Sequence, residues 1–157
     1  ELQREDIDAY TRTGAAIYGS VDASNHLRLG QSYGLRLAVD QYDDLLGSVT
    51  DAIVLSGFYN IRNDSTGFTL DPRDGSIVDL RVEPSVSSGD ATLGFVRFIG
   101  EGRIYESFLD EDRLTLAARV LTGWLEPVAG SADDVPPDRR FYAGGGGSVR
   151  GYEYNSI

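Results

Sequence analysis

Three groupings of residues have types and spacings that could support catalysis. Residues 144–147 are four consecutive glycines, which phosphate-binding loops also use, but no Lys-Ser or Lys-Thr pair follows them. Asp71 and Asp74 form a carboxylate pair of the kind used in acid–base chemistry, but they lie among turn-forming residues without a companion base. His26 is the only histidine, which disfavours a serine–histidine–acid triad. We therefore expect a protein that is not an enzyme, with Asp71, Asp74 and His26 as turn residues.

Clusters of acidic residues are a second candidate for chemistry, because such clusters can hold calcium. Their spacing matches no dedicated calcium loop, and solvated turns are the preferred interpretation. The chain has no cysteine, so it offers neither thiolate ligands nor disulfides. We expect no metal ion and no cofactor. The clusters are Asp40, Asp43 and Asp44, then Asp110, Glu111 and Asp112, and then Asp133 and Asp134.

The composition restricts the partners that the chain can have. All 14 basic residues are arginine, and 25 acidic residues give a net charge of -11, which repels nucleic acid at long range. No apolar run approaches the roughly 18 to 20 residues of a membrane-spanning helix. The mean hydropathy of -0.24 is compatible with a membrane β-barrel and with a soluble sheet. Methionine is absent even at position 1, so we expect an internal piece of a longer protein.

Alternation of apolar and polar residues with period two is the dominant pattern and predicts β-strands. It is clearest in residues 33–42, 52–61, 77–86 and 113–124, and weaker in 13–23 and 92–108. Turn-forming residues separate these segments, so we expect an all-β antiparallel meander over residues 1–125 and a long loop over 126–157.

Three details of this meander are predicted as well. Pro84 cannot donate to a ladder and is expected to end its strand, and a bulge or kink near Gly100 and Gly102 would explain the mixed phase of 92–108. Aromatic residues near strand ends suit the interfacial girdles of a membrane barrel or the core of a soluble sandwich. They include Tyr42, Tyr59, Tyr105 and Phe108.

The most specific motif lies in the long loop, where the run PPDRRFYAGGGGSVRGY begins at Pro136. Its glycines allow a close backbone bend, and Arg150 carries a planar fork of donors suited to a carboxylate. The run resembles the signature of the BamA- and TamA-like surface antigen family, closest to TamA-like members. The matching residues are Gly144, Gly145, Gly146 and Gly147, followed by Val149, Arg150, Gly151 and Tyr152.

Two further stretches are similar to the same family at lower specificity. Residues 68–75 look like its periplasmic turn with Pro and Gly, and Arg62, Asn63 and Asp64 stand where the family often carries Asp and Arg. The resemblance implies a fragment of a 16-stranded transmembrane barrel in the outer membrane of a Gram-negative bacterium. About seven strands and the arginine-bearing extracellular loop would be present. Arg150 would brace the lumen against an acidic strand motif beyond residue 157.

The function that the resemblance implies is non-enzymatic insertion or translocation of other outer-membrane proteins. Client outer-membrane proteins and the lipid bilayer would be partners, with a periplasm-spanning partner possible for the full-length protein. A two-partner-secretion transporter and, from another class, a soluble β-sandwich binding module are the alternatives. An isolated fragment with unpaired edges and an apolar face is expected to self-associate or to pack one half of its sheet onto the other.

Overall fold

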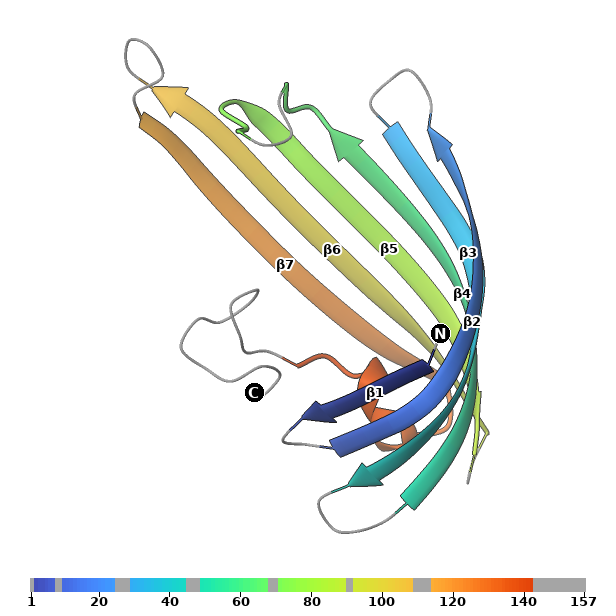
Figure 1. Cartoon of the computed structure of the whole chain (residues 1–157). Coiled ribbons are helices and arrows are strands. Elements are labelled where there is room, and N and C mark those ends of the chain that lie inside the picture. Colours follow the sequence, from blue (N-terminus) through green and yellow to red (C-terminus); the bar gives the residue numbers. More distant parts are fainter. Residues whose placement is uncertain are drawn as a thin grey trace.

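The computed structural model describes residues 2–7, 10–24, 29–44, 49–67, 71–89, 92–108 and 114–142. In this part of the chain seven strands form one antiparallel sheet in sequence order, β1 to β7. Figure 1 shows that the sheet curves like the wall of an open barrel. The strands are β1 (Leu2–Ile7), β2 (Tyr10–Ser24), β3 (Leu29–Asp44), β4 (Val49–Asp64), β5 (Gly75–Ser88), β6 (Thr92–Phe108) and β7 (Leu114–Ala129). The expected all-β meander is confirmed.

The period-two alternation assigns side chains to the two faces of this sheet. Residues such as Ala38, Val54 and Phe95 lie on the concave inner face and are buried. Their sequence neighbours, such as Leu37 and Leu55, lie on the convex outer face and are about half exposed. In the observed register, inner-face residues pair with inner-face residues of the next strand, and outer-face residues pair with outer-face residues. A slip of one residue would exchange the two faces.

Two details of the strands differ from the sequence prediction. Pro84 lies inside β5 and does not end it, and the pairing between β4 and β5 is interrupted at Gly57 and Phe58, opposite Pro84 and Glu83. Proline is therefore accommodated where no ladder bond to β4 is made. The register shift of β6 lies at Gly94/Phe95, and not near Gly100 and Gly102, which pair regularly with both neighbouring strands.

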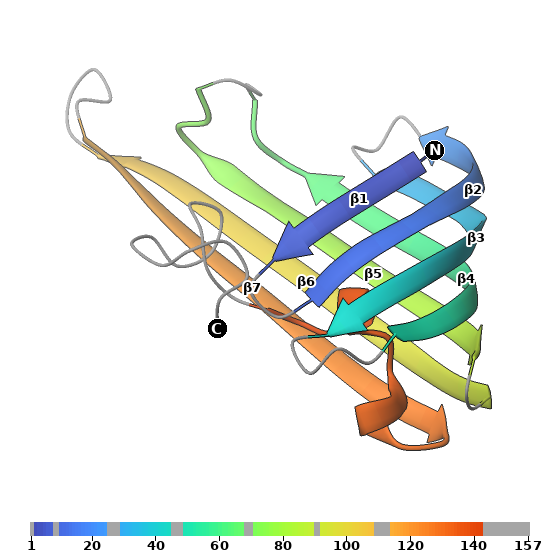
Figure 2. The same ribbon diagram turned by 60° about the horizontal axis from the view of Figure 1, so that its bottom comes forward.

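The chain leaves the sheet after Ala129 and turns back over the inner face. Two short 3-10 helices follow, η2 (Ala132–Asp134) and η3 (Pro137–Arg139). Figures 1 and 2 place both helices inside the curve of the sheet, at the end where β3, β5 and β7 stop. Residues 65–67 and 71–74, which belong to the connection between β4 and β5, lie at the opposite end.

The described strands form one open sheet, so neither half of the sheet packs onto the other. Self-association of an isolated fragment stays a prediction. The buried apolar cluster is small and lies between the sheet and the returning loop. It consists of Tyr42, Ala52, Val54, Leu93, Phe95 and Val135.

Candidate functional site

The returning loop, residues 130–142, has a defined conformation that its own residues stabilise. Gly130 has a φ of 89°, and a Cβ at this position would lie 2.7 Å from Leu93 Cδ1, so the turn out of β7 requires glycine. Ser131 begins η2 with a capping box: its hydroxyl accepts from the Asp133 amide, and Asp134 accepts from the Ser131 amide at 3.1 Å. Arg140 donates to the Val135 and Asp133 carbonyls at 2.9 and 2.7 Å.

An apolar contact holds this loop on the sheet. Val135 is 1% exposed and packs against side chains from β3, β4 and β6, including Tyr42, Val54 and Phe95. Burying a valine side chain contributes about 1.5 to 3 kcal/mol relative to leaving it exposed. We call Val135 and the cluster around it the apolar anchor.

A buried polar cluster, the polar anchor, lies beside it and joins β2, β3 and the loop. It consists of Arg12, Asp40, Tyr42 and Asp138. Arg12 donates from Nε to Asp40 Oδ1 at 2.9 Å, and its Nη1 lies 3.4 Å from Asp138 Oδ2. The Tyr42 hydroxyl donates to Asp138 Oδ1 at 2.6 Å. The side chains of Arg12, Asp40 and Asp138 are 7%, 0% and 6% exposed, so one buried cation connects two buried carboxylates.

Gly14 makes room for this arrangement on β2. It stands opposite Asp40 in the ladder, and a Cβ at this position would lie 2.0 Å from Asp40 Oδ1. A larger residue would displace the carboxylate toward which Arg12 points. The glycine is therefore part of the polar anchor's construction.

The polar anchor makes the loop sensitive to pH. Burial raises the pKa of Asp138 above its usual range, against the opposing effects of the Tyr42 hydrogen bond and the Arg12 charge, while Asp40 adds to the rise. Between the ordinary aspartate pKa of about 4 and the raised value, the folded state holds a proton that the unfolded state has released. Stability from this group therefore falls as the pH rises through that window.

Comparison with the non-titrating variant Asp138→Asn tests this sign. The melting temperature of the wild-type full-length protein, minus that of the variant, should decrease as the pH rises from about 4 toward neutrality. Thermal unfolding in detergent at several pH values measures the difference. A difference that increases with pH would mean that Asp138 has a lowered pKa in the folded protein.

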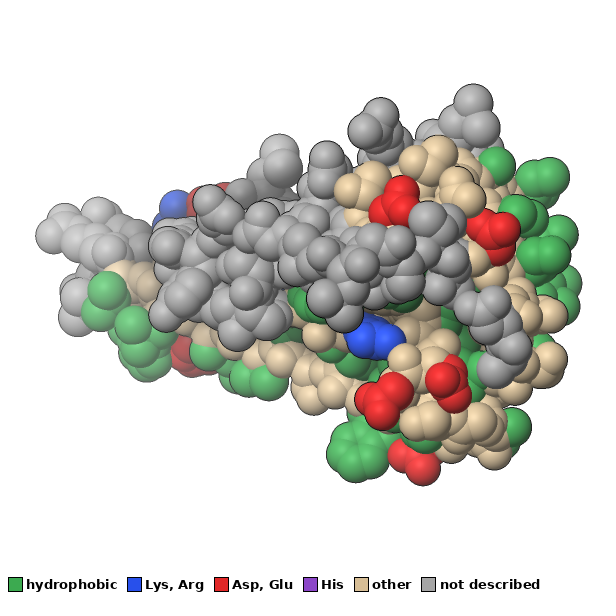
Figure 3. All heavy atoms as spheres, turned by 90° about the horizontal axis from the view of Figure 1, so that it is seen from below, with side chains coloured by type: hydrophobic (Ala, Val, Ile, Leu, Met, Phe, Trp, Pro, Cys, Tyr) green, Lys and Arg blue, Asp and Glu red, His purple; other side chains and the backbone are tan. Residues whose placement is uncertain are grey.

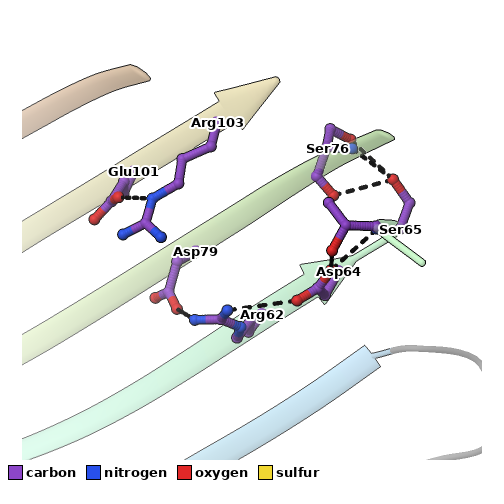
Figure 4. Close-up of polar contacts among 8 residues, drawn as sticks. Arg62, Asp64, Ser65, Ser76, Asp79, Glu101 and Arg103 are labelled. Atoms are coloured by element: carbon purple, nitrogen blue, oxygen red, sulfur yellow. Dashed lines mark hydrogen bonds and ion pairs between the residues drawn. The ribbon is translucent and has the colours of Figure 1, made fainter. Parts of the chain in front are cut away.

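The rest of the inner face carries charges that pair across strands. Figure 4 shows Asp79 beside Arg62 and Glu101 beside Arg103, and Arg119 of β7 donates to Glu101 at 2.9 Å. These side chains are about one fifth to one half exposed. An inner surface of partly exposed ion pairs is typical of a polar barrel lumen.

A second charged group leads from the sheet to the distal part of the loop. Glu83 lies 2.8 Å from Arg81 and 3.2 Å from Arg97. The guanidinium of Arg97 stands over the Phe141 ring at 5.1 Å from its centroid. A Cβ on Gly123 would lie 2.6 Å from that ring, so β7 leaves space for Phe141. The glycine run and the VRGY motif, Gly144–Gly147 and Val149–Tyr152, follow at once and lie outside the described residues.

The outer face carries a continuous apolar band with polar limits. On β4 the band runs from Ile53 to Ile61 between Asp51 and Asn63, and on β5 it runs from Val78 to Val86 between Ser76 and Ser88. These lengths match the about 9 to 11 residues of a tilted membrane strand. Figure 3, which views the sheet from the loop end, shows hydrophobic side chains along the outer rim.

The register shows how this band is inclined to the strands. Gln31 ends the band on β3 and pairs with Ile61, Asn63 ends it on β4 and pairs with Val78, and Ser76 ends it on β5 and pairs with Ile104. From each strand to the next, this limit of the band is thus displaced along the strand direction. The opposite limit, which runs from Gln41 to Glu126, is displaced less. With about 3.3 Å per residue and 4.8 Å between strands, the strands tilt roughly 45 to 55° across the band. This is close to the tilt of membrane barrel strands.

The structure corrects two interpretations of individual side chains. Asp40 is no solvated turn residue, because it is buried in the polar anchor. Tyr42 and Tyr105 do not belong to an outer girdle, because both lie on the inner face, whereas Tyr59 and Phe108 lie exposed on the outer face. Of the other acidic residues, Asp133 and Asp134 lie in η2, where the Asp134 carboxylate accepts from the Ser131 amide, and residues 110–112 lie outside the described part.

The described residues offer neither a metal site nor a helix that could span a membrane. No group of three or more His, Asp or Glu side chains there is arranged to hold a metal ion. None of the helices described is long and apolar enough to cross a membrane. Asp71 pairs with Arg73, and Asp74 accepts from the Ser107 amide, so both carboxylates of the predicted turn make local structural contacts.

Comparison with known proteins assigns the family. The model of the Omp85 superfamily domain matches residues 4–157, so the chain belongs to the Omp85 superfamily. No solved structure matches the chain. The resemblance to the BamA- and TamA-like superfamily and the fold of a partial barrel are thereby confirmed, whereas the closeness to TamA-like members stays a prediction. Members of this family are outer-membrane proteins of Gram-negative bacteria, and their general role is the assembly or transport of proteins at that membrane.

Proposed function

We propose that the chain forms part of the wall of an outer-membrane barrel that inserts or translocates other outer-membrane proteins without enzymatic chemistry. Family membership over residues 4–157 supports the general role. The observation that carries the proposal is the anchored loop: Val135 and Asp138 fix its first part to the inner face, directly before the VRGY run. In this mechanism the barrel opens at a seam and templates a client strand by β-augmentation.

Arg150 is proposed to brace the lumen from the distal part of the loop. The two anchors hold residues 130–142 at one end of the sheet, and the run that carries Arg150 follows them in the sequence. On the inner face, Arg62 already pairs with Asp79, and Arg119 already pairs with Glu101. A further arginine in that lumen would need a carboxylate of its own, because an unpaired buried charge is costly.

An insertion assay with the full-length protein tests both proposals. Vesicles containing the wild-type protein should accelerate folding of a urea-denatured client barrel at least tenfold over empty vesicles, and Arg150→Ala should lose most of this gain. Heat-modifiable migration of the client on a gel measures folding. Arg73→Ala, which removes an exposed arginine of the β4–β5 connection at the opposite end, is the matched control. Equal rates with and without the wild-type protein would refute the insertion function.

A two-partner-secretion transporter is the second candidate of the same family class. Its signature in this assay would be no client insertion together with release of a dedicated secreted cargo from cells. A soluble sandwich is disfavoured by the inclined apolar band of the outer face, because a dry sandwich interior would need a second sheet over it. The described strands provide none.

A further inference from the structure

Two hollows lie within the apolar band of the described outer face. The first, of about 440 Å³, lies over Gly57 between Tyr33, Leu35, Tyr59 and Pro84. The second, of about 360 Å³, lies over Gly100 between Leu80, Phe98, Thr122 and Trp124. Both volumes fall within the range of about 300 to 1,000 Å³ typical of ligand sites.

Missing side chains create both hollows. A Cβ on Gly57 would meet Leu35 and Pro84 at 3.7 Å, which is ordinary contact. A Cβ on Gly100 would meet Thr122 at 3.2 Å and Leu80 at 3.4 Å. The Cβ on Gly57 would therefore fit without displacing a neighbour, whereas the Cβ on Gly100 would be a tight fit against Thr122. Neither glycine has a positive φ that would require its presence.

The hollows lie level with each other, halfway across the apolar band. Gly57 is the midpoint of the run from Ile53 to Ile61, and Val82, which borders both hollows, is the midpoint of the run from Val78 to Val86. Because the band spans the hydrocarbon, its midline corresponds to the middle of the bilayer. Ends of lipid acyl chains are the groups found at that depth.

The surrounding residues indicate which lipid supplies the chain. The walls are apolar and aromatic, and the guanidinium of Arg81, the only charged residue bordering them, stands over Phe58 on the inner face. The polar limits of the band on β3 to β6 carry no cation that would attract an anionic headgroup. These limits are Gln31, Gln41, Asp51, Asn63, Ser76, Ser88, Thr92 and Glu106.

We propose that these hollows seat the ends of acyl chains from zwitterionic phospholipids, one chain over Gly57 and one over Gly100. The proposal requires only that the outer face contacts the membrane, and it does not depend on what the barrel inserts or exports. Aromatic rings of Tyr59 and Phe98 and the Trp124 indole would contact the chains and slow their exchange with bulk lipid.

Filling each hollow tests the proposal by native mass spectrometry. The full-length protein is released from vesicles of phosphatidylethanolamine, and the retained phospholipids are counted. Gly57→Leu and Gly100→Leu should each at least halve retention. Gly102→Leu is the matched control, since it adds the same side chain to the outer face of β6 where a Cβ would meet nothing within 4 Å. Equal retention in all four proteins, or an equal loss in the control, would overturn the proposal.

Two further measurements keep the test decisive. In vesicles that also contain lipopolysaccharide, retention of lipopolysaccharide in place of phospholipid would overturn the assignment of the occupant.

Trp124 is the only tryptophan in the chain, and it stands one outer-face position from Glu126, to which its Nε1 donates at 3.2 Å. With other tryptophans of the polypeptide replaced by phenylalanine, bromine near the chain end should quench Trp124 at least twofold more than bromine near the headgroup. Gly100→Leu should abolish that preference, and stronger quenching by shallow bromine in the wild type would contradict a seated chain end.

Discussion

Replacement of Arg12 by alanine is expected to destabilise the folded protein by about 3 to 5 kcal/mol, the range seen when one partner of a buried ion pair is removed. Arg12 is the cation between two carboxylates whose side chains are 0% and 6% exposed. Without it, Asp40 loses the donor at 2.9 Å, and Asp138 keeps the Tyr42 hydroxyl and the neighbouring Arg139 but loses the cation that it shares with Asp40. Urea titration of the full-length protein in phospholipid vesicles measures the free energy of unfolding.

A matched arginine and a double variant separate burial from charge. Arg62→Ala removes a pair that is about half exposed, and such a pair contributes at most about 1 kcal/mol. Arg12→Ala combined with Asp40→Ala should recover a large part of the loss, because the most deeply buried charge then no longer needs a partner. If Arg12→Ala costs no more than Arg62→Ala, the polar anchor does not hold the sheet and loop together.

The strand pattern was predictable from the sequence because successive residues of a strand lie on opposite faces of the sheet, and the two faces have different surroundings. Residues 33–42 and 77–86 alternate so regularly that their faces follow from the sequence, and the structure confirms them. Pro84 was misplaced because propensity alone does not reveal that the β4–β5 ladder is interrupted opposite it. The bulge was predicted at the wrong position because a glycine in a strand can mark either a backbone distortion or, as at Gly100, a hollow beside the strand.

The polar anchor was not predictable in the same way. Tyr42 and Asp138 are 96 positions apart, and no local pattern connects them. Asp40 resembled a turn residue because Asp43 and Asp44 follow it, although it stands in the inner-face phase of its strand. Gly14 is the one signal that pairing of the predicted strands would have offered, since only a residue without a side chain fits opposite Asp40. The resemblance points to Arg150, which lies outside the described residues, and gives no indication of Arg12.

Replacement of Val135 by aspartate is expected to release the loop while the sheet stays folded. The wild-type side chain is 1% exposed among Tyr42, Val54 and Phe95, where a carboxylate would have no cation in contact within the apolar cluster. Leaving a charge there costs several kcal/mol, more than one buried valine contributes to docking. The chain avoids that cost by undocking, since residues 130–142 are attached to the sheet chiefly through the two anchors.

Trypsin reports this release directly. Arg139 is 5% exposed and Arg140 donates to two backbone carbonyls, so the wild-type loop should resist cleavage after both arginines. Val135→Asp should be cleaved there at least tenfold faster, equivalent to about 1.4 kcal/mol or more of lost docking free energy if cleavage follows the population of the open loop. Ala132→Asp places the same charge on an exposed position of η2 and should leave the cleavage rate unchanged. Resistance of Val135→Asp to trypsin would mean that the polar anchor alone holds the loop, and the client-insertion assay on the same variant then shows whether docking of residues 130–142 is needed for function.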